Sequence, residues 1–181
     1  MIERREYYDR ISSFINQPLI KVITGIRRSG KSTLLNLVQK HLIDSGISDK
    51  NIIYINFESM KYYEYRDAKK LYDYITKIIK EDEMTYLFFD EIQLVNSWEE
   101  AINSFMVDFN VDIYITGTNS NLLSSELSTL LSGRYIQLQL QPLSFSEMVE
   151  FYKVYTDNDD KEDLLWRYIR RGGFPLIHIA D

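Results

Sequence analysis

Residues 25–32 read Gly-Ile-Arg-Arg-Ser-Gly-Lys-Ser, which is a complete G-x-x-x-x-G-K-[ST] phosphate-binding pattern. The pattern follows an apolar run at residues 19–23 and precedes helically spaced apolar residues at 33–38, so it joins an expected strand to an expected helix. In that position the glycines let backbone N–H groups converge on an anion, and the helix N-terminus adds its positive end. The stretch therefore predicts a site for a nucleoside triphosphate.

Individual residues of this loop have distinct expected roles. Lys31 can reach the β- and γ-phosphates as a point charge, and the Ser32 hydroxyl can ligate Mg²⁺. The alternative is a glycine turn beside a surface lysine, but a chance match to the whole pattern has odds on the order of one per cent at ordinary residue frequencies. The remaining residues expected to bind the nucleotide are Gly25, Arg28, Ser29, Gly30 and Thr33.

Composition limits the classes of function that fit. The chain has 181 residues, 45% of them hydrophobic, which suits one domain with a substantial core. A formal net charge of −6 argues against a dominant electrostatic hold on nucleic acid, although three arginine pairs leave a local basic patch open. The sequence has no cysteine, which excludes disulfides and thiolate metal sites. Without a signal peptide or a long apolar run, we expect a soluble cytoplasmic protein with no membrane contact.

Apolar spacing predicts a regular alternation of strands and helices. Such alternation is typical of an α/β fold with an open, mostly parallel sheet and helices on both faces. We expect an ATPase core over residues 1–141 and the start of a helical C-terminal segment over 142–181. Ser97–Glu100 and Ser144–Glu147 have the spacing of capping boxes, and Gly46 is a plausible helix stop. The expected strands are 19–23, 51–57, 85–90, 111–117 and 135–140, and the expected helices include 3–16, 33–46, 71–79, 98–109, 122–131 and 144–155.

Two acids end the third expected strand. Asp90 and Glu91 follow the apolar run at residues 85–89. Because Mg²⁺ takes a carboxylate at the carboxyl edge of a strand near the phosphate loop, we assign Asp90 to the magnesium shell through a bound water. Glu91 would then polarise or deprotonate the attacking water. The alternative for Glu91 is that it caps the following segment.

Polar residues also end the fourth expected strand. Thr116, Thr118 and Asn119 lie about 25 residues beyond the acids. A polar side chain there can position the attacking water and sense the γ-phosphate. We choose Asn119 for this role, with Thr116 and Thr118 as rivals, and the alternative for Asn119 is an N-cap of the next helix.

The order of these motifs resembles the additional-strand catalytic-glutamate branch of P-loop ATPases. The chain is similar to the AAA-type domain, in the AAA/STAND neighbourhood, of bacterial and archaeal ATP-binding proteins that carry a C-terminal domain of unknown function. Three stretches carry this resemblance: the exact sequence of residues 25–32, residues 130–135, and the turn Gly172-Gly173-Phe174-Pro175. The resemblance implies a P-loop αβα sandwich with strand order 5-1-4-3-2. It also implies that family members continue well beyond residue 181.

The resemblance further implies a catalytic-type arginine near Arg134, before the fifth strand. From there Arg134 can reach the nucleotide of a neighbouring copy more easily than its own, which implies a homo-oligomer. A structural or solvated arginine at a strand start is the alternative. The turn at 172–175 can lie near the nucleotide or serve only as a sharp turn.

Together the motifs predict a domain that binds and hydrolyses ATP with Mg²⁺ and acts as a conformational switch or motor. One rival is a small-molecule kinase, but no clustered lid arginines occur in the sequence. The other is a non-catalytic, nucleotide-gated regulatory module associated with DNA or another partner. Phosphate release distinguishes the ATPase from the binding module, and acceptor-dependent formation of ADP would indicate the kinase.

Overall fold

The computed structural model describes residues 4–80, 83–118, 131–155, 160–174 and 177. Its centre is a five-stranded sheet in the order β2-β3-β4-β1-β5, and every neighbouring pair of strands is parallel. This is the predicted order, and it confirms the α/β fold of P-loop type. The strands are β1 (Ile20–Gly25), β2 (Ile52–Asn56), β3 (Thr85–Asp90), β4 (Val111–Gly117) and β5 (Tyr135–Leu140).

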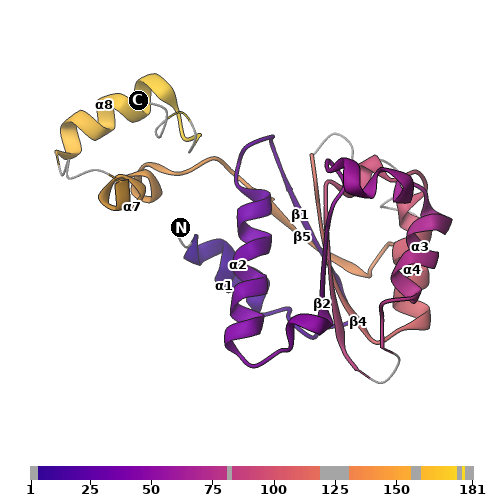
Figure 1. The fold of residues 1–181 in the computed structure, drawn as a ribbon. Coiled ribbons are helices and arrows are strands. Elements are labelled where there is room, and N and C mark those ends of the chain that lie inside the picture. Colours follow the sequence, from indigo (N-terminus) through magenta and orange to yellow (C-terminus); the bar gives the residue numbers. More distant parts are fainter. Residues whose placement is uncertain (1–3, 81–82, 119–130, 156–159, 175–176, 178–181) are drawn as a thin grey trace.

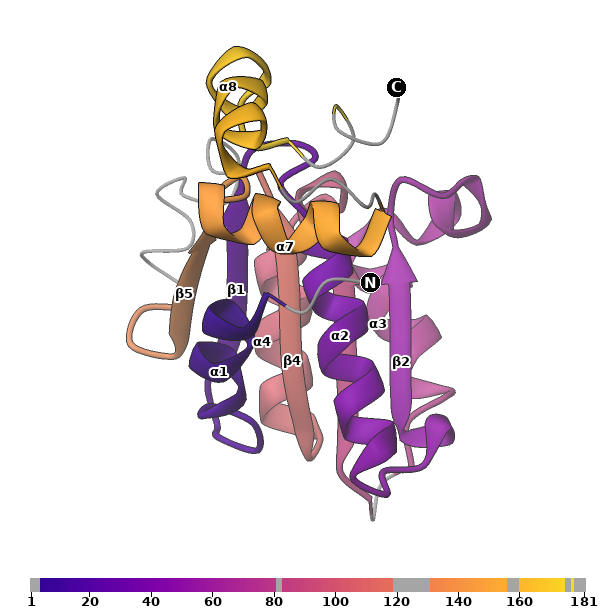
Figure 2. The same cartoon turned by 90° about the vertical axis from the view of Figure 1, so that its left-hand side faces the viewer.

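Helices cover both faces of the sheet and make three layers (Figure 1). One face carries α1 and α2, the other carries α3 and α4, and α7 and α8 lie beyond the carboxyl ends of the strands (Figure 2). In the part of the chain that the structure describes, no helix is long and apolar enough to cross a membrane. The helices are α1 (Arg5–Ser12), α2 (Lys31–Asp44), α3 (Ala68–Thr76), α4 (Trp98–Asp108), α7 (Phe145–Tyr155) and α8 (Lys161–Arg171), with 3₁₀ turns η1 (Asp49–Asn51), η2 (Met60–Tyr65) and η3 (Ile92–Leu94).

Two apolar cores follow from this layering. Phe89 and Phe105 belong to the core between the sheet and α3–α4, whereas Leu35 and Phe88 belong to the core between the sheet and α1–α2. Strand β3 is buried at every position, because a central strand of a parallel sheet is covered on both faces. That burial explains why its sequence is continuously apolar until it reaches its terminal acid.

The helix boundaries test the predicted caps. Gly46 has φ 97°, and the N–H groups of Gly46 and Ile47 bond to the carbonyls of Ile43 and Leu42, which confirms the predicted helix stop. The capping box at Ser144 is also confirmed, because the Glu147 N–H donates to Ser144 Oγ and the Ser144 N–H donates to the Glu147 carboxylate.

The capping box predicted at Ser97 is wrong. Ser97 precedes α4, but its backbone is left-handed at φ 53° and ψ 34°, and its side chain accepts no capping hydrogen bond. The Glu100 N–H bonds instead to the backbone carbonyl of Ser97, at 3.0 Å. A capping side chain requires an extended backbone at the cap, and Ser97 does not have one. The predicted helix at 122–131 falls almost wholly outside the described residues.

A buried ion pair lies toward the amino ends of the strands. Lys21 of β1 and Asp112 of β4 are 0% and 1% exposed, and the ammonium donates to the carboxylate. Asp112 also accepts hydrogen bonds from the Asn16 N–H at 2.9 Å and from the Tyr114 hydroxyl at 3.0 Å, and these donors stabilise its buried charge. Burial lowers the pKa of Lys21, and the charge of Asp112 opposes that shift. Asp112 of β4 thus connects to β1 through Lys21 and to the segment before β1 through Asn16.

We expect Asp112→Ala to lower the free energy of unfolding by about 3–5 kcal/mol, because it leaves a buried ammonium without its carboxylate. The matched control is Asp73→Ala, which removes a carboxylate paired with Lys69 on an exposed helix face and should hardly move the transition. Urea unfolding of both variants measures the difference. Equal, small effects would show that the buried pair contributes nothing to stability.

Candidate functional site

The candidate site gathers at the carboxyl edge of the sheet. Because the strands are parallel and in register, with Gly25 opposite Leu140 and Asn56 opposite Asp90, their last residues meet along one edge. Ligands of open α/β sheets bind outside this edge. The phosphate-loop residues and the acids that the sequence singled out therefore lie at the same end of the molecule.

The phosphate loop turns where no side chain fits. A Cβ on Gly25 would lie 2.5 Å from the carbonyl oxygen of Leu140 and 2.8 Å from Ser29 Oγ. Gly30, at φ 99°, occupies the left-handed region at the start of α2, which favours glycine. Ser29 Oγ is buried and has no hydrogen-bond partner among the described residues. The loop thus has the close backbone approach that a phosphate cradle needs.

Lys31 brings the loop to the end of β3. Its ammonium donates to the carbonyls of Gly25 and Ile26 at 3.2 and 3.4 Å, and it lies 3.4 Å from the Glu91 carboxylate. Both side chains are largely withdrawn from solvent, at 4% and 14% exposed. The structure therefore places the predicted phosphate-binding cation directly beside the predicted catalytic acid.

Asp90 is wholly buried and accepts hydrogen bonds on both oxygens. Thr116 donates to Oδ1, while the Tyr54 hydroxyl and the Asn56 amide donate to Oδ2 at 2.9 and 3.2 Å. Burial and the neighbouring Asp90 charge raise the pKa of Tyr54. Sequence reasoning missed Tyr54 and Asn56. Their signal is that polar side chains occupy alternate positions of β2, on one face, next to the strand that carries Asp90.

Glu91 has an unusual backbone. At φ 57° and ψ 49° it is left-handed, a conformation that non-glycine residues adopt mainly where the surrounding structure enforces it. Its N–H donates to Thr116 Oγ1 at 3.0 Å, and Gln93 donates to its Oε2. Gln93 is a second residue that sequence reasoning missed. These contacts hold the carboxylate at the edge of the sheet.

Thr116 links the two acids. Its hydroxyl donates to Asp90 and accepts from the backbone of Glu91, and the residue is wholly buried. Thr118 is half-buried. Asn119, the residue chosen from the sequence, lies outside the described residues, so its role stays a prediction. Of the three polar candidates, the structure shows Thr116 in contact with the acids.

Oxygen donors suited to Mg²⁺ are present at this edge. Ser32 follows Lys31 in the first turn of α2, and Asp90 lies next to Glu91, so the Lys31–Glu91 contact brings the two donors to one region. Among the described residues, no group of three or more acidic or histidine side chains can hold a metal ion. Ser32 and Asp90 are the residues that could hold a magnesium ion at this edge.

The other predicted site residues are more peripheral. Arg28 and Thr33 are exposed, and Arg28 is left-handed at φ 68°. Arg134 precedes β5, and its guanidinium donates to Asn103 at 3.0 Å. The parallel register places Arg134 one strand length, about 20 Å, from the loop of its own chain. Arg134 therefore does not reach a nucleotide bound at that loop.

Comparison with known proteins agrees with this geometry. The profile of a family described as an AAA domain matches residues 17–149. An uncharacterized protein of Haemophilus influenzae is 43% identical over the whole chain, and the uncharacterized protein MJ1544 of Methanocaldococcus jannaschii is 35% identical over 90% of it. The Walker-type ATPase PABY2304 of Pyrococcus abyssi superposes with a TM-score of 0.66 at 17% identity, over 97% of this chain and 65% of its own.

The chain belongs to the AAA domain family, since the profile covers most of its length. It spans 46% and 37% of the lengths of the Haemophilus and Methanocaldococcus relatives. Membership of this family, together with the fold shared with a Walker-type ATPase, indicates a nucleotide-binding protein.

We expect Thr116→Val to lower the free energy of unfolding by about 1–3 kcal/mol, because valine keeps the shape but leaves buried polar partners unpaired. Thr116→Ser is the matched control, since it keeps the hydroxyl and loses one methyl group. Denaturant unfolding of both variants checks the expectation. A valine variant as stable as the serine variant would mean that the hydroxyl bridge adds nothing.

Proposed function

We propose that this AAA-family chain is a Mg²⁺-dependent ATPase module that binds ATP at residues 25–33 and hydrolyses it. The observation that carries the proposal is the convergence of Lys31 and Glu91, at 3.4 Å, beside a buried Asp90 that accepts three hydrogen bonds. A purely structural glycine turn would need neither the paired acids nor their supporting donors.

In this proposal the loop and α2 bind the triphosphate. Backbone N–H groups of the loop and the N-terminus of α2 face the phosphates, and Lys31 exchanges its loop carbonyls for phosphate oxygens. Ser32 and Asp90 are the residues that would hold Mg²⁺, which would supply positive charge to stabilise the charge that develops on the phosphates.

Glu91 is the proposed general base. It accepts a proton from the water whose oxygen attacks the γ-phosphorus, while the bond from that phosphorus to the β,γ-bridging oxygen breaks and the electrons leave with ADP. Gln93 restrains the carboxylate from one oxygen, and the left-handed backbone fixes its direction. Thr116 connects Glu91 to Asp90, and Asn119 would act beside the attacking water.

The biological use of turnover is also part of the proposal. We infer that hydrolysis drives or resets a conformational switch in a longer protein, of which residues 1–141 form the ATPase core. Arg134 would then act on the nucleotide of a neighbouring copy, because it lies at the opposite end of β5 from its own loop.

We expect Lys31→Ala to weaken Mg-ATP binding by on the order of 10²-fold, because it removes a charge-assisted contact with phosphate. Isothermal titration calorimetry measures the affinity. Lys40→Ala is the matched control, since Lys40 lies exposed on the same helix. Unchanged affinity in the Lys31 variant would remove the loop from the binding site.

Glu91→Gln should keep ATP affinity but lower turnover by about 10²–10⁴-fold, because the amide preserves the shape and cannot accept the proton. Phosphate release under saturating Mg-ATP is the measurement, with the exposed Glu100→Gln as control. A variant that hydrolyses ATP at the wild-type rate would place the base elsewhere. ATP binding without phosphate release in the wild type would instead favour a nucleotide-gated binding module.

A further inference from the structure

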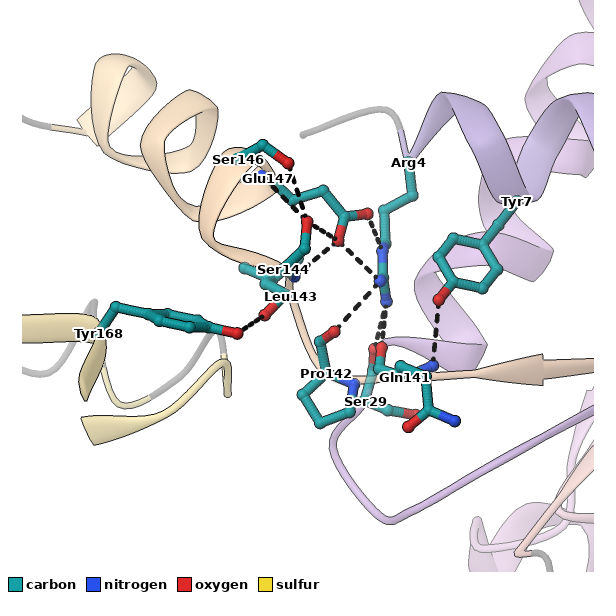
Figure 3. Close-up of polar contacts among 10 residues, drawn as sticks. All are labelled: Arg4, Tyr7, Ser29, Gln141, Pro142, Leu143, Ser144, Ser146, Glu147 and Tyr168. Atoms are coloured by element: carbon teal, nitrogen blue, oxygen red, sulfur yellow. Dashed lines mark hydrogen bonds and ion pairs between the residues drawn. The ribbon is translucent and has the colours of Figure 1, made fainter. Parts of the chain in front are cut away.

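Arg4 uses every donor of its guanidinium in a buried network at the phosphate loop (Figure 3). An arginine side chain has five N–H groups. Nε donates to Glu147 Oε1 at 2.8 Å, one terminal nitrogen donates to the carbonyls of Ser29 and Gln141 at 3.1 and 2.7 Å, and the other donates to the Pro142 carbonyl and Glu147 Oε2 at 3.4 and 3.1 Å. The side chain is only 8% exposed.

These contacts join parts of the chain that are remote in sequence. Ser29 belongs to the phosphate loop, Gln141 and Pro142 follow β5, and Glu147 lies in the first turn of α7. The guanidinium also lies over the ring of Tyr7, 4.3 Å from its centroid, and the Tyr7 hydroxyl accepts the Gln141 N–H at 3.4 Å. A planar fork with fixed donor directions suits this set of acceptors, and a lysine ammonium does not.

The contact with Ser29 bears directly on phosphate binding. The carbonyl of Ser29 and the N–H of Gly30 belong to one trans peptide and point in opposite directions. A guanidinium that holds this carbonyl on one side therefore fixes the direction of the Gly30 N–H on the other. Gly30 is the loop residue immediately before the phosphate-binding lysine, so the orientation of its N–H matters for any bound anion.

We propose that Arg4 is a positioning residue for the phosphate loop, and that it makes nucleotide affinity depend on the position of the first turn of α7. The proposal rests on the proposed binding of ATP at this loop. The role proposed for Arg4 needs no contact with the nucleotide or the reacting atoms. Arg4 acts through the Ser29–Gly30 peptide, and Glu147 in turn orients Arg4.

Glu147 is shared between Arg4 and the start of α7. Its Oε2 accepts the Ser144 N–H at 2.8 Å and the Ser144 hydroxyl at 3.0 Å, as well as Arg4. Burial acts to raise the pKa of Glu147, but the hydrogen bonds from Arg4 and Ser144 and the charge of Arg4 together lower it, so the carboxylate stays ionised at neutral pH. Any shift of the first turn of α7 therefore moves the partner of Arg4.

A second link extends the coupling to α8. The Leu143 N–H donates to the Gly173 carbonyl at 2.7 Å, and the Tyr168 hydroxyl donates to the Leu143 carbonyl at 3.0 Å. A Cβ on Gly173 would lie 2.1 Å from the Leu143 carbonyl oxygen, so only glycine fits there. Within the described part of the turn at 172–175, Gly173 therefore contacts Leu143, which lies between β5 and α7.

Arg4→Lys is the direct test, because it keeps the positive charge but cannot reproduce the forked contacts. We expect it to weaken binding of Mg-ATP, and of tripolyphosphate as a probe of the loop alone, by on the order of tenfold in titration calorimetry. Glu147→Gln can still accept from Ser144 but loses its charge on Arg4, and we expect a smaller loss of about threefold.

Two controls separate positioning from stability. Arg10→Met changes an exposed arginine of α1, the helix that begins directly after Arg4, and should leave both affinities unchanged. Asp112→Ala lowers the stability of the fold at a position far from the loop. The affinity of its folded fraction for Mg-ATP and tripolyphosphate, measured at low temperature, should equal that of the wild type. If Arg4→Lys does not fold, Glu147→Gln carries the test.

Wild-type affinity in a folded Arg4→Lys or Glu147→Gln variant would overturn the inference, as would equal losses in Asp112→Ala. A wild-type chain that binds neither Mg-ATP nor tripolyphosphate would overturn the proposed function itself, and the positioning role with it. If Lys31→Ala loses nucleotide binding while Arg4→Lys and Glu147→Gln bind like the wild type, only the positioning role is contradicted.

Discussion

The close contact of Gly25 with the Leu140 carbonyl is the constraint on which the site depends, because no side chain fits between β1 and β5 at that point. The phosphate loop begins there, and Lys31 folds back onto the Gly25 carbonyl. Arg4 then holds both sides of the contact, through Ser29 on the loop and Gln141 beyond β5. A loop anchored at both flanks can present its N–H groups without reorganising when an anion arrives, which favours binding.

The burial of the Asp90 carboxylate determines how the acids at the end of β3 are arranged. Asp90 lies in the interior because donors from β2 and β4 satisfy its oxygens, and one hydroxyl, that of Thr116, also secures the backbone of Glu91. A buried carboxylate without such donors would be costly. The same interactions that stabilise the buried acid therefore also fix the direction of its carboxylate, so stability and geometry have a common cause.

Local sequence patterns predicted much of the fold, because the phosphate-loop motif and the apolar runs are local properties. The strands follow from these patterns, whereas the order of the strands came from the resemblance to P-loop ATPases. The role of Arg4 could not be predicted, since Glu147 lies 143 positions away and an Arg-Arg pair is usually solvated surface. Tyr54 and Asn56 were missed for the same reason, since Asp90 lies 36 and 34 positions away. Gln93 is close to Glu91 in sequence, but its contact forms at the left-handed turn of Glu91, which the sequence did not predict. Ser97 shows the converse failure: its spacing matched a capping box, but the pattern says nothing about φ, which is left-handed.

Backbone amide shifts of the isotopically labelled chain, recorded by NMR during titration with Mg-ATP, test most directly whether this edge of the sheet is the nucleotide site. The largest shifts should fall on the N–H groups of residues 29–33, with smaller ones at Glu91 and at residues 141–147, which Arg4 links to the loop. Saturable shifts confined to another surface, or none at concentrations well above those at which AAA domains bind nucleotide, would contradict the assignment.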